Sequence, residues 1–205
     1  MRIAVLSLAT HNLSYAEISN QNSVIYCGRN GYDFISVTSL PGGCHPMWHK
    51  IKILRETLPE YDFVLLKDAD SVFIPLATPL SAFVDLEFAA SRQSPKASLN
   101  SGHIWMKNTQ RNLDMLDVVM AGPNFGLNIG RHEEEAIENL ISAGKIPWFT
   151  MLDKNMFNAN VFRSGGGRIF STIIQDTVTV HFQGHLKDDK NWVELMSKIA
   201  DDANK

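Results

Sequence analysis

Cysteine, long hydrophobic runs and clustered basic charge are all scarce in this sequence, and each scarcity excludes a class of protein. Cys27 and Cys44 are the only cysteines among 205 residues, too few for a disulfide scaffold, and neither lies in a C-x-x-C pair. A reducing compartment is the simplest expectation, with one bridge as the alternative. The first apolar run, residues 3–8, is too short for a signal-peptide core or a membrane span. We therefore expect a cytoplasmic protein with no membrane segment.

Charge argues against a nucleic-acid partner. The formal net charge is −3, and the 19 lysines and arginines are scattered along the chain. A protein that binds a nucleic-acid backbone normally carries a basic stripe. The hydrophobic fraction of 44% and charged fraction of 20% are those of an ordinary globular protein. The length fits one domain over residues 1–205.

Strand-like and helix-like segments alternate along the chain, which predicts an α/β domain with a mostly parallel central sheet flanked by helices. The expected strands cover residues 3–8, 34–38, 62–67, 88–91, 102–106 and 177–182. The expected helices cover residues 15–27, 46–58, 111–121, 133–143 and 192–200. Gly28 and Gly31 are expected to end the first helix.

Two carboxylates, Asp68 and Asp70, follow an apolar run of strand length. Residues at the carboxyl end of a buried strand lie at the edge where open α/β sheets bind ligands. Two neighbouring carboxylates repel each other, and a divalent cation that also binds phosphate relieves this repulsion. The alternative is that one aspartate caps a following helix and the other is solvated. The position after the strand favours a metal site.

A histidine, His181, ends the β-branched segment TVTVHF. An imidazole added to two carboxylates gives a mixed nitrogen and oxygen ligand set, which suits Mn²⁺ better than Ca²⁺. Gly184 allows the backbone to approach a phosphate, and Lys187 supplies a positive charge for it. The alternative is a core histidine in an edge strand with no ligand.

These segments together resemble the retaining, nucleotide-sugar-dependent glycosyltransferases of the GT-A fold, a Rossmann-like architecture. The segment HFQGHLK (181–187) is similar to the HFxGxxK element of family 8, the glycogenin group. Residues 45–73, which run from HPMWHKIKILR to DADSVF, are similar to family 34, the galactosyl-, mannosyl- and xylosyltransferases. Small domains of this kind occur in the capsid-glycosylation enzymes of chlorella viruses, which the chain also resembles. The resemblance implies a UDP-sugar donor and a saccharide or glycoprotein acceptor.

The resemblance also implies a metal site. In it, Asp70 and His181 bind Mn²⁺ or Mg²⁺, and Asp68 contacts the metal and the nucleotide ribose. Lys50 matches a helix lysine that reaches the sugar-phosphate region of the donor. The alternative for Lys50 is a lysine that extends along apolar neighbours to the surface.

Further donor contacts are implied at other turns of the chain. Asn100 and Gly102 match an NSG segment that lines the donor sugar, although an ordinary turn explains them nearly as well. The loop after the first strand is expected to hold the uracil, and the loop after His181 the diphosphate. The residues expected in these two loops are Ala9, Thr10, Asn12, Gly184 and Lys187.

One segment departs from the family pattern. Families 8 and 34 place an acid-Gln pair at the start of a late helix, and this chain reads HEEEAI (132–137) there. Glu134 takes the acid position and Glu135 replaces the glutamine. Glu134 shares a helix face with Ile137, so we favour Glu134 as the site carboxylate. A cluster that only satisfies the helix dipole is the alternative.

Two other functions use similar residues. One is a metal-dependent nucleotidyltransferase or phosphohydrolase, but the first would favour a Gly-rich loop after the first strand, where this chain has ATHN. A phosphatase of the haloacid-dehalogenase type would carry its D-x-D after the N-terminal strand. The other is a non-catalytic nucleotide-sugar-binding module, which no missing motif supports. We therefore expect a glycosyltransferase, with retention of configuration implied by the resemblance alone.

Overall fold

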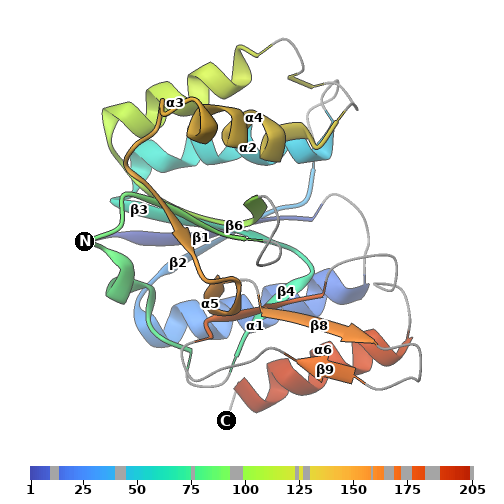
Figure 1. Cartoon of the computed structure of the whole chain (residues 1–205). Helices are drawn as coiled ribbons and strands as arrows, with labels where there is room; N and C mark the ends of the chain where they lie inside the picture. The colour runs from blue at the N-terminus through green and yellow to red at the C-terminus, as the bar shows by residue number, and fades with distance from the viewer. Residues whose placement is uncertain are drawn as a thin grey trace.

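A six-stranded sheet forms the centre of the molecule in the computed structural model (Figure 1). Its strands lie in the order β2-β1-β3-β6-β5-β7. The strands are β1 (Ile3–Leu8), β2 (Asp33–Val37), β3 (Phe63–Asp68), β5 (Phe88–Arg92), β6 (Leu99–Lys107) and β7 (Phe149–Leu152). The structure describes residues 1–9, 14–39, 45–74, 77–92, 99–122, 125–126, 130–157, 159–163, 169–171, 177–182 and 190–203.

The sheet is mostly parallel, as predicted, and β6 is its reversed strand. β1 pairs in parallel with both β2 and β3, and β5 pairs in parallel with β7. β6 runs antiparallel to β3 and β5. The beginning of β6 therefore lies beside the end of β3, with His103 opposite Lys67. Residues from two different strand ends meet at this edge.

Helices cover both faces of the sheet (Figure 1). One face carries α2 (Pro46–Thr57), α3 (Gln110–Met120) and α4 (His132–Ser142), and the other carries α1 (Ser14–Asn30). α6 (Lys190–Ala203) lies on the outer side of α1. The helix ends follow local chemistry, since Pro46 occupies the first turn of α2 and Thr109 caps α3 through Asn112 N. The shorter helical segments are η1 (Leu58–Glu60), η2 (Leu80–Phe83) and α5 (Lys154–Phe157).

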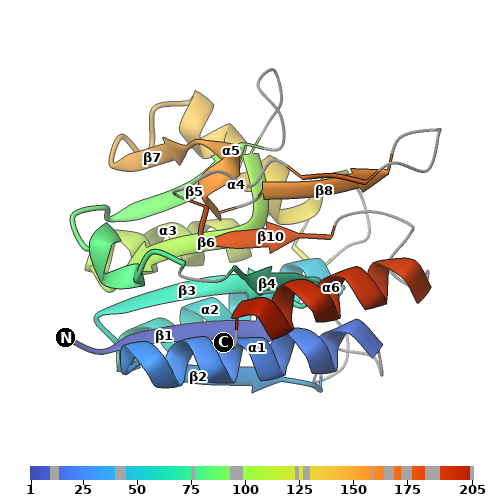
Figure 2. The same cartoon turned by 90° about the horizontal axis from the view of Figure 1, so that it is seen from below.

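A second, smaller sheet lies on the α1 side (Figure 2). It contains β4 (Ser71–Phe73), β10 (Thr179–His181), β8 (Ala159–Arg163) and β9 (Ile169–Ser171), in that order. β4 follows directly on the Asp68–Asp70 turn and pairs antiparallel with β10. Helix α6 packs against both α1 and β4. The C-terminal part of the chain is thereby attached to the end of β3.

Apolar side chains fill both interfaces of the central sheet. Leu54, Leu66 and Leu116 belong to the cluster between the sheet and α2, α3 and α4. Phe63 and Trp105 stack on the opposite face with ring centroids 5.0 Å apart. No helix in the described ranges is long and apolar enough to cross a membrane.

Most expected elements are confirmed, with three corrections. Gly28 lies inside α1, and the helix ends at Gly31, whose φ of +69° suits glycine. β6 begins at Leu99, before the expected start at residue 102, so the alternative of an ordinary turn at Asn100 and Gly102 is wrong. The strands β4, β7, β8 and β9 were not expected from the sequence, because short strands carry little periodic signal.

Replacing Asn112 tests the contact between α3 and the neighbouring strands. Asn112 is fully buried, donates to Lys107 O (2.8 Å) and accepts from Trp148 Nε1 (2.8 Å). Asn112→Ala leaves these groups without their partner and should lower the free energy of unfolding by about 2–3 kcal/mol in urea titration. The exposed neighbour Gln110→Ala should change it by less than about 0.5 kcal/mol. Equal effects of the two variants would contradict this account.

Candidate metal and nucleotide-sugar site

The acidic turn lies at the carboxyl end of β3. Asp68 is the last residue of β3, Asp70 lies in the following turn, and β4 begins at Ser71. Asp70 is buried, whereas the Asp68 side chain is 29% exposed. The helix-cap alternative is wrong, because a strand and not a helix follows the turn. One carboxylate is thus buried, while the other is partly exposed to solvent.

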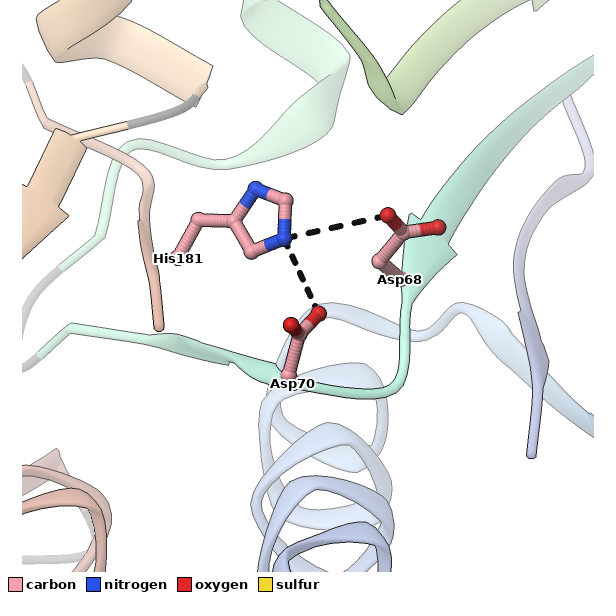
Figure 3. A group of neighbouring side chains, drawn as sticks. All are labelled: Asp68, Asp70 and His181. Carbon is pink, nitrogen blue, oxygen red and sulfur yellow. Dashed lines mark hydrogen bonds and ion pairs between the residues drawn. The ribbon is translucent and has the colours of Figure 1, made fainter. Parts of the chain in front are cut away.

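His181 lies against both carboxylates (Figure 3). Its Nε2 is 2.9 Å from Asp70 Oδ1 and 3.7 Å from Asp68 Oδ2. One ligand atom from each of the three residues lies within 4.8 Å of the others. The pairing of β10 with β4 produces this contact by setting His181 opposite Ser71. β10 lies between β4 and β8, so His181 is not in an edge strand.

Gly102 makes room for the His181 ring. A Cβ atom at position 102 would lie 2.5 Å from His181 Cε1 and 2.8 Å from Asn100 Oδ1. Contacts under 3.0 Å do not occur at real Cβ atoms, so any side chain here would force the imidazole to move. Asn100 Oδ1 accepts the Gly102 N–H at 2.9 Å. The two residues expected to line the donor sugar therefore lie beside the metal-ligand group.

Lys50 extends from α2 into the same site. Its Nζ lies 2.8 Å from Glu133 Oε1, 3.4 Å from Asp68 Oδ1 and 3.0 Å from Ser101 Oγ. Lys50 is only 3% exposed, so the alternative of a lysine reaching the surface is wrong. Burial would lower the pKa of Lys50, but the Asp68 and Glu133 carboxylates outweigh burial and raise it. The ammonium is therefore charged at neutral pH.

The three glutamates at the start of α4 occupy different environments. Glu133 is fully buried and accepts from Ser101 Oγ at 2.6 Å. Glu134 accepts the Ser101 N–H at 3.0 Å, and burial raises its pKa. Glu135 is exposed and accepts the Arg131 N–H at 3.3 Å. The structure brings Glu133 and Glu134 to the site and leaves Glu135 outside it.

Two buried charged residues of the site were missed from the sequence. Glu133 lies four residues before buried Ile137, and this helix spacing was a usable signal for an inward position. Lys67 lies in β3 next to Asp68 and is fully buried, which lowers its pKa to about 8. A lysine in an apolar strand was an available sign of a buried charge, since lysine is almost never fully buried without partners.

The remaining expected residues lie elsewhere or are not described. Ala9 is buried after β1, and its N–H donates to Val37 O at 2.9 Å. It lies at the same edge as the acidic turn, because Leu8 pairs with Asp68. The expected residues that lie outside the described part of the chain are Thr10, Asn12, Gly184 and Lys187.

The formal charges of the site fit a divalent cation. Four carboxylates gather here against two ammonium groups, so among the described residues of the site the formal negative charges exceed the positive ones by two. The carboxylates are those of Asp68, Asp70, Glu133 and Glu134, and the ammonium groups are those of Lys50 and Lys67. Two carboxylates and one imidazole are also a donor set that suits Mn²⁺ or Mg²⁺.

Solved structures match this arrangement of strands and helices. The crystal structure of a glycosyltransferase involved in glycosylation of the major capsid of PBCV-1 superposes with a TM-score of 0.74. It is 18% identical, and the match covers 97% of this chain and all of that one. The chain has a glycosyltransferase fold. The fold and the resemblance predicted from the sequence are thus confirmed.

A second glycosyltransferase fold extends the comparison. The galactosyltransferase LgtC, solved with donor and acceptor sugar analogues, superposes with a TM-score of 0.62 at 12% identity. The match covers 97% of this chain and 95% of LgtC. No protein-family model and no curated protein sequence matches the chain. At these identities the likeness concerns the fold alone.

Gly102→Ala tests whether the missing side chain at this position determines where His181 lies. The added methyl group should displace the imidazole and weaken Mn²⁺ binding by about 10- to 100-fold, the usual effect of disturbing a ligand's support. Isothermal titration with Mn²⁺ measures this change. Gly28→Ala is the matched control, because a Cβ there meets nothing within 4 Å. Unchanged Mn²⁺ affinity in Gly102→Ala would contradict the role given to this glycine.

Glu133→Gln and Glu135→Gln separate the buried glutamate from the exposed one. Glu133→Gln breaks the buried ion pair with Lys50 and should lower the free energy of unfolding by about 3 kcal/mol. Glu135→Gln should change it by less than about 0.5 kcal/mol. Urea denaturation followed by fluorescence measures both. A larger loss of unfolding free energy in Glu135→Gln than in Glu133→Gln would contradict the assignment of Glu133 as the buried partner of Lys50.

Proposed function

We propose that this protein is a metal-dependent glycosyltransferase that moves a sugar from a UDP-sugar to a saccharide or glycoprotein acceptor. The convergence of Asp68, Asp70 and His181 at the ligand-binding edge of a glycosyltransferase fold carries the proposal. The resemblance of residues 45–73 and 181–187 to families 8 and 34 supports the donor and the retention of configuration.

The proposed cation is Mn²⁺ or Mg²⁺, held by Asp68, Asp70 and His181. When bound, it would supply Lewis-acid stabilisation to the diphosphate leaving group. The ligand chemistry supports this choice, because hard oxygen donors with one imidazole suit these ions. The residues already lie close enough to share one ion, which reduces the reorganisation that binding requires.

Lys50 contributes a fixed positive charge next to the proposed metal ligands. Transfer breaks the bond between the anomeric carbon and the diphosphate, so negative charge grows on the leaving phosphate. The Lys50 ammonium is held by Glu133 and Ser101 and touches Asp68 Oδ1. A charge held in place before the reaction stabilises the transition state without further reorganisation. We assign Lys50 to the stabilisation of the leaving group.

Glu134 is the candidate acid beneath the reacting sugar. Its carboxylate is fixed by the Ser101 N–H, which donates to it at 3.0 Å. Retention proceeds either through a carboxylate nucleophile, as in retaining glycosidases, or through a front-face exchange. Glu134 is the nucleophile in the first route and supports the sugar's developing positive charge in the second. Glu135, exposed on the other side of the helix, has no part in this proposal.

A panel of nucleotide sugars tests donor and metal together. The melting temperature is measured with UDP-, GDP- and CMP-sugars, each with Mn²⁺ and with EDTA. A UDP-sugar at 100 times its Kd should stabilise the fold by about 2.7 kcal/mol, only with Mn²⁺. Stabilisation that does not depend on metal, or that is equal for all nucleotides, would contradict the proposal.

Transfer assays with variants complete this test. Sugar release or transfer from the best donor is followed by mass spectrometry. Asp70→Asn and His181→Ala should each lower kcat by at least about 100-fold, the usual loss for one electrostatic contact to the leaving group. Exposed Asp114→Asn is the matched control and should retain full activity. Binding without turnover would favour a nucleotide-sugar-binding module, and phosphate release without sugar transfer a phosphohydrolase.

A further inference from the structure

The acidic turn has a buried lysine directly beneath it. Lys67 lies one residue before Asp68 in β3, so its side chain leaves the opposite face of the sheet, toward α1. Its Nζ lies 2.6 Å from Ser19 Oγ, 2.7 Å from Ser71 O and 3.4 Å from Asp68 O. Asp68 and Ser71 are the two ends of the turn that carries Asp70. The ammonium therefore contacts the backbone on both sides of the proposed metal ligands.

Every close partner that Lys67 has among the described residues is a hydrogen-bond acceptor. The Ser19 hydroxyl donates its own proton to Ser71 O at 2.7 Å, and the Ser71 hydroxyl donates to Asp68 O at 2.8 Å. Neither hydroxyl has a second proton to offer to a neutral amine. Three donors on an ammonium match the three oxygens of Ser19, Ser71 and Asp68. The surroundings are those of a charged group.

No carboxylate in the described part of the chain forms an ion pair with Lys67. Burial lowers the pKa of Lys67, and the fields of Asp70 and Asp68, with a smaller one from the Cys27 thiol, favour its charged form. Lys67 and Asp70 are both buried, so water screens the attraction between the ammonium and this carboxylate only weakly. The negative charge that balances Lys67 is therefore the acidic pair itself.

We propose that Lys67 is a built-in counter-cation of the acidic turn, which stabilises Asp68 and Asp70 without metal and weakens their hold on a divalent cation. The proposal rests on the proposed function only in taking these two carboxylates as metal ligands. A fixed positive charge attracts the carboxylates but repels a metal ion bound to them. Lys67 is thus a positioning residue that keeps the metal-free site folded and the metal exchangeable.

A double-mutant cycle in EDTA at pH 7 tests the first half of the proposal. Lys67→Met should lower the urea midpoint, and Asp70→Asn in the same chain should recover at least about half of that loss, because it removes the unbalanced charge. Ser19→Ala is the matched control, since it removes a hydrogen bond from the same ammonium without changing any charge. Its effect should add to that of Asp70→Asn. Additive effects of Lys67→Met and Asp70→Asn would overturn the proposal.

Titration with Mn²⁺ alone tests the second half. Lys67→Met should bind Mn²⁺ about tenfold more tightly than the natural chain, because the repelling charge is gone. Ser19→Ala should stay within about twofold of it. A lysine with a merely structural role would leave Mn²⁺ binding unchanged or weaker, and either result would overturn the proposal.

Two outcomes separate this inference from the proposed function. If the natural chain binds no Mn²⁺, the metal site of the proposed function fails, and the cycle in EDTA alone decides on Lys67. If Lys67→Met does not fold in EDTA, the test is whether the double variant Lys67→Met with Asp70→Asn folds there. A folded double variant supports the counter-cation, and an unfolded one overturns it.

Discussion

The antiparallel pairing of β4 with β10 is the contact on which the site depends. It sets His181 opposite Ser71 and so brings an imidazole to two carboxylates that lie 111 and 113 residues earlier in the chain. β4 has only three residues and begins directly after the acidic turn, so the turn and the strand form one unit. Without this pairing, Asp68 and Asp70 would remain an acidic turn at the edge of a sheet.

The second constraint is the cost of burying several carboxylates together. Lysine side chains on both faces of the central sheet offset this cost. Lys50 approaches from α2 and Lys67 from the α1 side, and both ammonium groups are buried. Buried carboxylates without partners would cost several kcal/mol each. Glu133 adds a further negative charge, but its ion pair with Lys50 fixes that lysine next to Asp68. The site is thus a connected set of charges that a single substitution disturbs as a whole.

The sequence predicts the main sheet and the metal ligands because both have local signals. An apolar run followed by two aspartates identifies β3 and its turn, and the β-branched segment before His181 identifies β10. The other strands of the smaller sheet were not predictable, since β4 and β9 each have only three residues and show no period. Glu133 and Glu134 both lie at helix spacing from Ile137, so only the packed structure distinguishes their partners. The space that Gly102 leaves for His181 likewise depends on tertiary contact and has no local signature.

The division of the ligands between two sheets has a thermodynamic consequence. Asp68 belongs to the central sheet, whereas His181 belongs to the smaller one, which α6 covers. An ion bound to both residues would link the two sheets. It would therefore oppose local unfolding of β10 and α6 while the central sheet stays folded. Amide hydrogens of β10 and α6 would then exchange with solvent more slowly in the loaded protein, while those at the centre of β1 would change little. Metal binding at the site would in this way suppress local unfolding as far away as α6.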